Sequence, residues 1–410
     1  MLDGLFPRLE LLDEVFPQTR FTRELLRDVT LVGCQHLLES TGSLIEHLVR
    51  IGLNESQVFL MGKSYSTSES VLERLLSSDC HIEAGSRRVG HGRYNEEITR
   101  EATSLWRHAE EGINPRTRRI VILDDGGYVH LQTPSHILRA ANIVGVEQTT
   151  FGIAHNALIQ TRKMSVVNVA ESCAKRVYEA PLISDAVVQK IRRNVPLGGN
   201  TVCGVIGCGT IGLELAKKLI RDKVVVYVFD SSSHQMEKVP EKHWCESVKE
   251  LVSRCDVIFG CVGDDVLRLR DLSTADSGVK VFASCSSGDV EFRNILMEKI
   301  TWEEERGTGA FPTLAYSFTP NYRIRILRSG YPVNFDNSDE SVPTGMIQLT
   351  RALLCAGVLQ ACRILSKKKQ RFGSVKLDPD SQKRVVEAWL RITKTKGDVH
   401  DAGWFRDKSG

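Results

Sequence analysis

Long apolar runs are missing from this 410-residue sequence, so no segment is expected to span a bilayer. The opening residues, MLDGLFPRLELLDEVFP, are broken by charges and prolines and lack the apolar core of a signal peptide. The eleven cysteines are scattered and include no C-x-x-C pair, which argues against a disulfide framework and against a zinc site. We therefore expect a cytoplasmic protein with free thiols and no metal ion.

Charge of one sign is also scarce, because the formal net charge is only +3. The one dense basic cluster, residues 367–371, has no interleaved aromatic residues and is expected to be a solvated helix end. Internal repeats and low-complexity segments are missing too. These absences argue against nucleic-acid and membrane-surface binding, and they leave a globular protein with room for two or three domains.

The most informative stretch that is present runs from Thr201 to Asp230. An apolar strand, residues 202–206, leads directly into Gly207-Cys208-Gly209-Thr210-Ile211-Gly212, and a segment with helical apolar spacing follows. A second apolar strand, residues 224–229, ends on Asp230. A G-x-G-x-x-G run in this strand–turn–helix–strand context is typical of a dinucleotide-binding βαβ unit.

Each glycine of this run has a physical role in holding a pyrophosphate. Gly207 permits the tight turn, Gly209 lets the backbone approach the phosphates, and Gly212 lets the helix pack closely against the strand. The helix N-terminus directs its unpaired N–H groups at the negative charge. Asp230 would accept hydrogen bonds from the adenosine ribose and repel a 2′-phosphate, so the expected cofactor is NAD rather than NADP. The cofactor residues expected in this half of the chain are Gly207, Gly209, Thr210, Ile211, Gly212, Asp230 and Gly263.

Apolar strands alternate with helical segments along the chain, which indicates parallel α/β sheets. A glycine- and proline-containing segment, residues 196–200, precedes the glycine turn and is a natural hinge between two domains. In parallel sheets, ligands bind outside the carboxyl ends of the strands. The polar residues at such positions in the N-terminal half are His36, Ser66, Thr67, Asp125 and Glu147.

Short runs spread through most of the chain resemble the S-adenosylhomocysteine hydrolase family, in the family's order and separations. They are Gly33-Cys34-Gln35-His36, Ser66-Thr67, Leu123-Asp124-Asp125-Gly126-Gly127, Gly145-Val146-Glu147-Gln148-Thr149-Thr150, Val167-Asn168, the glycine turn with Asp230, Gly288-Asp289-Val290-Glu291 and Val333-Asn334.

The resemblance implies two doubly wound parallel-sheet α/β domains, the second a Rossmann NAD-binding domain. The expected ranges are 1–180 for a substrate domain completed by a returning helix at 345–395, 181–344 for the NAD-binding domain, and 396–410 for a C-terminal tail. In the family, tightly bound NAD oxidises the ribose 3′-hydroxyl, the 5′ substituent is eliminated, water adds, and the hydride returns.

The cofactor half of the family pattern carries over well. Thr149 and Thr150 match threonines that contact NAD from the substrate domain, and Asn334 matches the asparagine that holds the nicotinamide carboxamide. The usual third threonine is Phe151 in this chain.

The substrate half carries over in part. His36 and Asp125 match the residues that serve elimination and hydration, although a structural histidine and a turn aspartate are the alternatives. Gln148 stands where the family has a glutamate, and Glu147 is its neighbour. The expected substrate-binding residues are Ser66, Thr67, Glu147 and Gln148.

The family's groups that grip and deprotonate the 3′-hydroxyl fall on Cys173, Val177 and Tyr178. Valine cannot accept a proton, so Cys173 and Tyr178 are the remaining catalytic candidates, and each could instead be a packing residue. Lys175 matches a second lysine of the family. Because two residues turn a helix by roughly 200°, we expect Lys175 to face away from position 173.

Three functions therefore stay open. The first is an NAD-dependent enzyme that reversibly oxidises a hydroxyl of a nucleoside or sugar-like substrate, with or without elimination or hydration, since the cofactor contacts are kept while the adenosine contacts are replaced. The second is a non-catalytic NAD-binding paralogue that acts as a sensor or partner subunit. The third is a diverged S-adenosylhomocysteine hydrolase. A homo-oligomer, dimer or tetramer, is expected, with no nucleic-acid or membrane partner.

Overall fold

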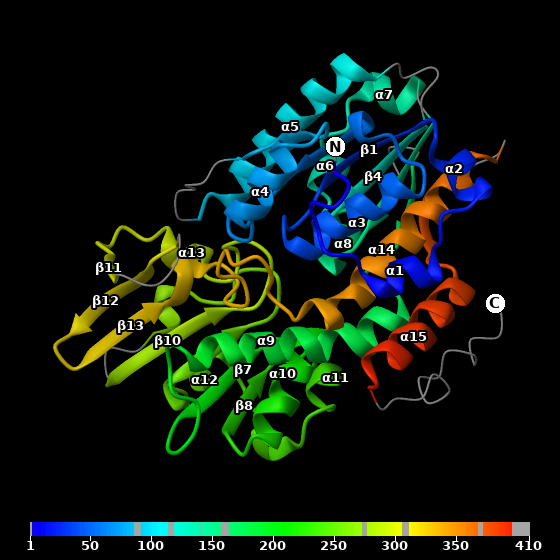
Figure 1. Cartoon of the computed structure of the whole chain (residues 1–410). Coiled ribbons are helices and arrows are strands. Elements are labelled where there is room, and N and C mark those ends of the chain that lie inside the picture. The colour runs from blue at the N-terminus through cyan, green and yellow to red at the C-terminus, as the bar shows by residue number, and fades with distance from the viewer. Residues whose placement is uncertain are drawn as a thin grey trace. The chain divides into compact units, whose positions relative to one another are not determined.

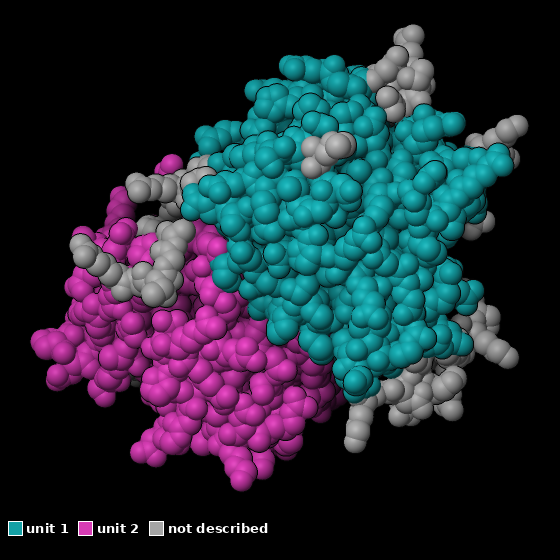
Figure 2. Space-filling view, viewed as in Figure 1, with its two compact units in different colours: residues 1–86, 97–179, 338–410 teal, residues 87–96, 180–337 magenta. Residues whose placement is uncertain are grey.

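The computed structural model describes residues 2–85, 92–113, 119–140, 142–156, 164–272, 277–305, 311–367 and 372–395. The chain divides into two compact units, coloured separately in Figure 2. Unit 1 comprises residues 1–86, 97–179 and 338–410, and unit 2 comprises residues 87–96 and 180–337. The expected C-terminal tail, residues 396–410, lies outside the described residues.

Unit 1 is built on a seven-stranded sheet in which every pair of neighbouring strands is parallel. Figure 1 shows this sheet among the helices of the unit. In spatial order the strands are β14 (Gly373–Lys376), β6 (Ser165–Asn168), β5 (Asn142–Glu147), β4 (Arg119–Asp124), β1 (Val29–Cys34), β2 (Val58–Met61) and β3 (His81–Glu83).

The winding of this sheet reverses between β1 and β4. From β1 the chain moves outward to β2 and β3, and it then returns to add β4, β5 and β6 on the other side. The connections that follow the neighbouring strands β1 and β4 therefore run in opposite directions from the carboxyl ends of these strands. Such a switch point is where open parallel sheets bind their ligands.

Helices connect the strands of unit 1 and complete its core. They are α1 (Glu10–Val15), α2 (Arg20–Leu26), α3 (Glu39–Arg50), α4 (Glu69–Leu76), α5 (Tyr94–Gly112, whose first three residues belong to unit 2), α6 (Tyr128–Leu131), α7 (Ser135–Ala140), α8 (Thr150–Asn156), α14 (Thr344–Leu365) and α15 (Pro379–Thr393). Helix α14 packs on β4, β5 and β6 and against α3 and α15. Among the described residues it is the one helix long and apolar enough to cross a membrane, and 83% of its most apolar window is buried within the protein, as in a core helix.

Unit 2 contains a second seven-stranded sheet, whose helices are α9 (Ala180–Arg192), α10 (Thr210–Arg221), α11 (Ser233–Met236), α12 (Val248–Arg254) and α13 (Arg293–Leu296). Its strands in spatial order are β11 (Glu303–Glu305), β12 (Thr313–Thr319), β13 (Tyr322–Ile326), β10 (Gly278–Ser284), β9 (Val257–Gly260), β7 (Val202–Ile206) and β8 (Val225–Phe229). The winding reverses here between β7 and β9.

The predicted two-domain α/β architecture is confirmed, with one addition at an edge. Strands β13, β10, β9, β7 and β8 are parallel, whereas β12 pairs with β13, and β11 with β12, in antiparallel fashion. Only a short turn separates Thr319 from Tyr322, and a connection of that length permits an antiparallel hairpin but no parallel crossover.

The boundary between the units near the C-terminal side falls between Asn337 and Ser338, whereas the sequence placed it at 344. The reason is that residues 339 and 340 bond to helices of unit 1. The backbone oxygen of Asp339 accepts from Glu39 N (2.8 Å), and the carboxylate of Glu340 accepts from Ser40 N (3.0 Å).

Candidate functional site

The candidate catalytic group of unit 1 is His36, two residues beyond β1. Its Nδ1 lies 2.6 Å from Ser66 Oγ, and its Nε2 lies 3.2 Å from Asp125 Oδ2. Asp125 directly follows β4, so the pair meets at the switch point of the sheet. The imidazole is fixed on both sides, and an imidazole held in one orientation is suited to moving a proton.

Two further side chains converge on the Asp125 carboxylate. Lys63 forms an ion pair with Oδ1, and the side-chain amide of Gln148 donates to Oδ2. Lys63 stands two residues beyond β2, and Gln148 directly follows β5, so four neighbouring strand ends supply this cluster. His36, Ser66, Asp125 and Gln148 were predicted from the sequence. Lys63 was not, although its place after a strand could have indicated it.

The charges of this cluster follow from burial and pairing. Burial alone would raise the pKa of Asp125, but the Lys63 ammonium and His36 hold it well below its usual value. Burial would likewise lower the pKa of Lys63, and the Asp125 carboxylate instead raises it. Burial lowers the pKa of His36 despite Asp125, so the imidazole is neutral near pH 7. The result is a buried, charged Lys63–Asp125 pair beside a neutral histidine.

Exposure singles out His36 within this cluster. Its side chain is 13% exposed, whereas Asp125 is 2% exposed and Lys63 is fully buried. Ser66 is fully buried beneath the imidazole, and half-buried Thr67 donates its hydroxyl to the Lys63 carbonyl (2.9 Å). His36 is therefore the most accessible of the three charged or titratable side chains, and the substrate contacts expected of Ser66 and Thr67 stay predictions.

A second cluster, Asp124, His130 and Glu147, lies fully buried beside the first. His130 Nδ1 is 3.0 Å from Asp124 Oδ2 and 3.6 Å from Glu147 Oε2. Burial would lower the pKa of His130, but the two carboxylates raise it to about 9. This is the one group of the described residues whose ligand atoms could hold a metal ion. At neutral pH the histidinium itself supplies the positive charge between the acids.

Glu147 was expected to contact the substrate, and that contact stays a prediction. Its side chain is fully buried, and Oε1 accepts from Gly126 N (3.1 Å), Thr149 N (2.8 Å) and Thr149 Oγ1 (2.7 Å). The carboxylate therefore ties the loop after β4 to the loop after β5. Thr150, at the start of α8, is exposed, and the NAD contacts expected of Thr149 and Thr150 stay predictions.

The segment that should carry the hydroxyl-activating residues forms a π-helical turn, η3 (Lys175–Glu179), directly before α9. Tyr178 packs edge-on against Trp389, with ring centroids 5.6 Å apart, and Cys173 is half-buried before the turn. Lys175 was expected to face away from position 173, and this stays a prediction. Its ammonium reaches the backbone carbonyl of Gln148 and pairs with Glu179.

In unit 2 the glycine turn joins β7 to α10. Gly207 has φ +96°, and a Cβ on Gly212 would lie 1.9 Å from the Gly207 carbonyl oxygen, so neither position tolerates a side chain. Nothing lies within 4 Å of the position that a Cβ on Gly209 would take. Gly209 is also the N-cap of the twelve-residue α10, and no side chain caps it. An uncapped N-terminus beside open space fits a pyrophosphate.

Asp230 lies at the carboxyl end of β8, next to the turn. Its carboxylate accepts from Cys208 N (2.7 Å) and Ser232 N (2.8 Å), which uses two of its roughly four acceptor positions. The remaining positions suit the hydroxyls of a ribose. Exposed Thr210 and half-buried Ile211 begin α10, and the amides of this first turn are the donors that a phosphate would use.

Two other predicted cofactor residues lie in the loops that follow β9 and η6 (Leu327–Gly330). Gly263 adopts φ +79°, and its amide donates to Glu291 Oε1 (2.8 Å), as does Val262 N (2.9 Å). Glu291 is fully buried, and burial raises its pKa to about 7. Asn334 is 3% exposed, and its contact with the nicotinamide stays a prediction.

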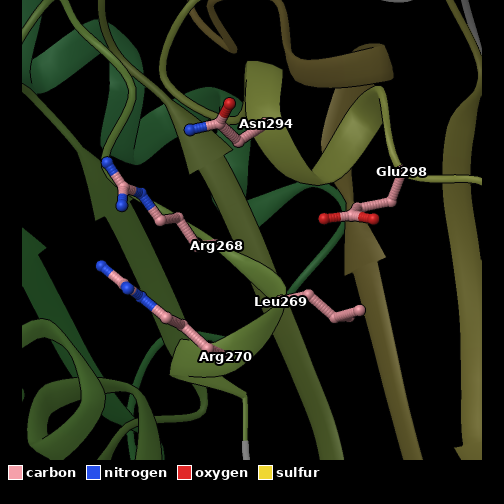
Figure 3. Close-up of a pocket in the computed structure, with 5 residues that line it drawn as sticks. All are labelled: Arg268, Leu269, Arg270, Asn294 and Glu298. Atoms are coloured by element: carbon pink, nitrogen blue, oxygen red, sulfur yellow. The ribbon is translucent and has the colours of Figure 1, made fainter.

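Figure 3 shows a separate hollow on the surface of unit 2. Arg268 and Arg270 extend side by side from one segment, and Asn294 and Glu298 come from α13 and the residues after it. None of the predicted cofactor residues lines it. The hollow is open, and we assign it no function.

Comparisons with solved structures give matches of low similarity. One is NAD-bound 3-phosphoglycerate dehydrogenase from Entamoeba histolytica, 12% identical, with TM-score 0.35, covering 65% of this chain and 75% of that one. Others are a 2-hydroxyacid dehydrogenase from Ketogulonicigenium vulgare (14% identity, TM-score 0.36, 63% and 73% covered) and the A chain of dipicolinate synthase from Bacillus subtilis (12%, 0.36, 63% and 80%).

Two of the curated proteins that this chain matches align over 344 residues at 30% identity, and both are uncharacterized proteins of Mycobacterium tuberculosis strains. The alignment covers 82% of this chain but only 64% of those relatives, so the chain spans less than two thirds of their length.

A protein-family model matches the segment that contains the glycine turn. The NAD binding domain of 6-phosphogluconate dehydrogenase matches residues 202–292, from the start of β7 to the end of the Asp289–Glu291 segment and one residue beyond. That range contains the open turn at Gly209 and the carboxylate of Asp230. The chain therefore carries a Rossmann domain that binds NAD.

Proposed function

We propose that this protein is an NAD-dependent enzyme of the adenosylhomocysteinase-like type that reversibly oxidises a hydroxyl group of a nucleoside or sugar-like substrate. The observation that carries the proposal is the neutral imidazole of His36, held between Ser66 and Asp125 at the switch point of the unit 1 sheet. A domain that binds NAD and a positioned acid–base residue are the two parts that such a reaction needs.

The bound dinucleotide would accept and return the hydride. In this proposal His36 takes a proton from the substrate at Nδ1, the ring nitrogen on the side of Ser66, and gives it back, while Nε2 stays on Asp125. Asp125, kept anionic by Lys63, orients the imidazole and stabilises its protonated form. Positioned acid–base groups of this kind contribute about 10²–10⁴-fold in rate.

Lys175 is our candidate for the missing group that activates the hydroxyl. Its ammonium lies on the Gln148 carbonyl and beside Glu179, and the Gln148 side chain in turn contacts Asp125. Glu179 is held by the hydroxyl of Thr350 (2.8 Å). The lysine therefore stands at the edge of the His36 cluster, in contrast with Tyr178, whose ring is packed against Trp389.

The experiment is a spectroscopic assay of purified protein loaded with NAD, in which the near-ultraviolet absorbance of NADH is followed as a panel of nucleosides and sugars is added. Reduction of the cofactor by any member supports the proposal. Release of homocysteine from S-adenosylhomocysteine would identify the substrate of the diverged-hydrolase alternative.

A non-catalytic NAD-binding subunit is the second candidate, and one observation favours it. Val177, in the place of the family's carboxylate, has a side chain that cannot accept a proton, and it is 41% exposed. If the whole panel leaves NAD oxidised while another protein co-purifies in fixed ratio, this second function replaces the first.

A further inference from the structure

Two cysteines occupy paired positions in the sheet of unit 2. In the parallel register of β9 and β10, Gly260 pairs with Ser284, and the next residues along the two strands are Cys261 and Cys285. Cys285 N donates to the Gly260 carbonyl (2.9 Å), so the pairing continues at this point. Because side chains alternate along a strand, both thiols lie on the sheet face that buries Phe259.

Cys285 affects the protonation of Cys261. The neighbouring Cys285 thiol, followed by burial, raises the pKa of the Cys261 thiol well above its usual value, so Cys261 stays protonated and we expect peroxide to attack Cys285 first. Paired positions on neighbouring strands lie about 4.8 Å apart, within the Cα separation of about 4.4–6.8 Å that a disulfide spans. Both side chains are partly exposed, whereas Cys203, Cys208, Cys245 and Cys255 of the same unit are buried.

Cys261 also packs closely against the glycine turn of unit 2. A Cβ added to Gly207 would lie 2.9 Å from the backbone carbonyl group of Cys261, and one added to Gly212 would lie 3.0 Å from the Cys261 Cβ. Cys261 N in turn donates to the Ile206 carbonyl (2.8 Å) at the end of β7. A displacement of Cys261 therefore changes the contacts that define the glycine turn.

We propose that Cys261 and Cys285 form a reversible disulfide that lowers the affinity of unit 2 for NAD. The proposal goes beyond the enzyme function above and depends only on the NAD-binding domain. The oxidant is hydrogen peroxide or a comparable peroxide. It converts one thiol of the pair to a sulfenic acid with release of one water, and the sulfur of the other cysteine then displaces a second water. The pair is oxidised by two electrons as the peroxide is reduced to two waters.

We expect the disulfide to affect NAD binding by displacing Cys261. Side chains at paired strand positions are separated by more than the Cβ···Cβ distance of about 3.8 Å that a disulfide favours, so bond formation draws Cys261 toward Cys285. Val262 and Gly263, whose amides are fixed by Glu291, follow directly in the chain. The movement is thus transmitted to the turn on one side and to the Gly263 loop on the other.

In the test, the 410-residue protein with reduced thiols is treated with hydrogen peroxide. It is then digested without a reducing agent, and mass spectrometry maps the linked peptides. Calorimetry measures the NAD dissociation constant before and after peroxide and again after dithiothreitol. We expect a peptide that links Cys261 to Cys285 and a dissociation constant raised roughly tenfold or more, a loss comparable to one hydrogen bond to a charged group. Dithiothreitol should restore the starting value.

Three variants sharpen the test, each compared with itself before and after peroxide. Cys261→Ser and Cys285→Ser should form no linked peptide and show a ratio of dissociation constants near one. Cys245→Ala, which changes a buried thiol elsewhere in unit 2, should respond as the wild type does. The proposal is overturned if the linked peptide is absent, if it forms without changing NAD affinity, or if Cys261→Ser keeps the peroxide response.

Discussion

Asp125 is the residue around which the unit 1 site is assembled, because Lys63, His36 and Gln148 all bond to its carboxylate. A buried carboxylate without partners would be protonated and could not orient a histidine. The full burial of Lys63 supplies the compensating charge. Removal of either partner of such a pair typically costs about 3–5 kcal/mol, so Asp125 and Lys63 support the fold as well as the site.

Replacement of His36 tests the proposed acid–base role. His36→Asn should reduce turnover by about 10²–10⁴-fold and leave NAD affinity unchanged, because the substituted side chain cannot exchange a proton. Steady-state rates and calorimetric NAD titrations would be measured in parallel. The matched control is His108→Asn. The side chain of His108 is 58% exposed, so this substitution should leave the turnover rate unchanged. A His36→Asn enzyme with normal turnover would remove His36 from the mechanism.

His130 predicts a pH dependence of stability. Its folded-state pKa of about 9 lies above that of a free histidine, so the ion pairs stabilise the protein fully below about pH 6.5 and are lost as the pH rises through about 9. The expected contribution is on the order of 3 kcal/mol. Urea unfolding of wild type and His130→Gln across this window should give curves that converge at the alkaline end. Parallel curves would contradict the assignment.

Glu291 predicts a pH dependence of cofactor binding. Its carboxylate holds the amides of Val262 and Gly263, and its pKa of about 7 means that this support weakens as the pH falls through neutrality. NAD affinity of the wild type should therefore decline several-fold below pH 7, since a hydrogen bond to a neutral acceptor is weaker than one to a charged acceptor. Glu291→Gln, which is neutral throughout, should show a flat profile in calorimetry. A wild-type profile that is equally flat would refute the role of Glu291.

At the scale of elements, the sequence predicted what local signals specify. The strand, turn and helix around Gly207 to Gly212 were predictable because a tight turn and an uncapped helix start each need particular residue types. The edge strands β11 and β14 were not predictable from the sequence. Glu303–Glu305 shows no alternation of apolar and polar residues, and both strands are defined only by their pairing with a neighbouring strand in the folded sheet. The π turn at Lys175 also escaped prediction, since helical periodicity assumes 3.6 residues per turn.

The acidic segment after Asn334 is explained at this scale too. Two of its carboxylates bond to helices of unit 1. Asp339 bonds to the hydroxyls of Ser68 (2.5 Å) and Ser70 (2.6 Å) at the start of α4, and Glu340 caps the N-terminus of α3. Acidic groups are stabilising at both places, because the helix dipole is positive there.

Glu340→Ala measures that cap. The change leaves the Ser40 amide without its acceptor and should lower the free energy of unfolding by about 1 kcal/mol, or the melting temperature by about 2–4 °C. Thermal unfolding followed by circular dichroism is sufficient. Glu304→Ala removes an exposed carboxylate and should change stability far less. Equal losses in the two variants would show that the cap contributes nothing.

At the scale of the whole molecule, two α/β units with separate switch points explain why the chain carries two candidate sites. Their existence was predictable from alternating strands and helices, whereas the assignment of residues 87–96 to unit 2 was not. That assignment rests on contacts distant in sequence, such as Gly92 N to Asp289 Oδ2 (2.7 Å) and the Tyr94–Tyr331 ring pair. The expected homo-oligomer and cytoplasmic location stay predictions.

The central claim is that NAD binds across the glycine turn of unit 2, and a calorimetric titration of Gly209→Ala tests it most directly. A Cβ at Gly209 meets no protein atom within 4 Å, so the variant should fold normally. Gly345→Ala, at a position equally open but in unit 1, is the control. We predict that Gly209→Ala raises the NAD dissociation constant at least about tenfold, because its methyl group occupies the approach of the pyrophosphate, and that Gly345→Ala leaves it unchanged. Equal NAD affinity in both variants, or no NAD binding by the wild type, would contradict the account.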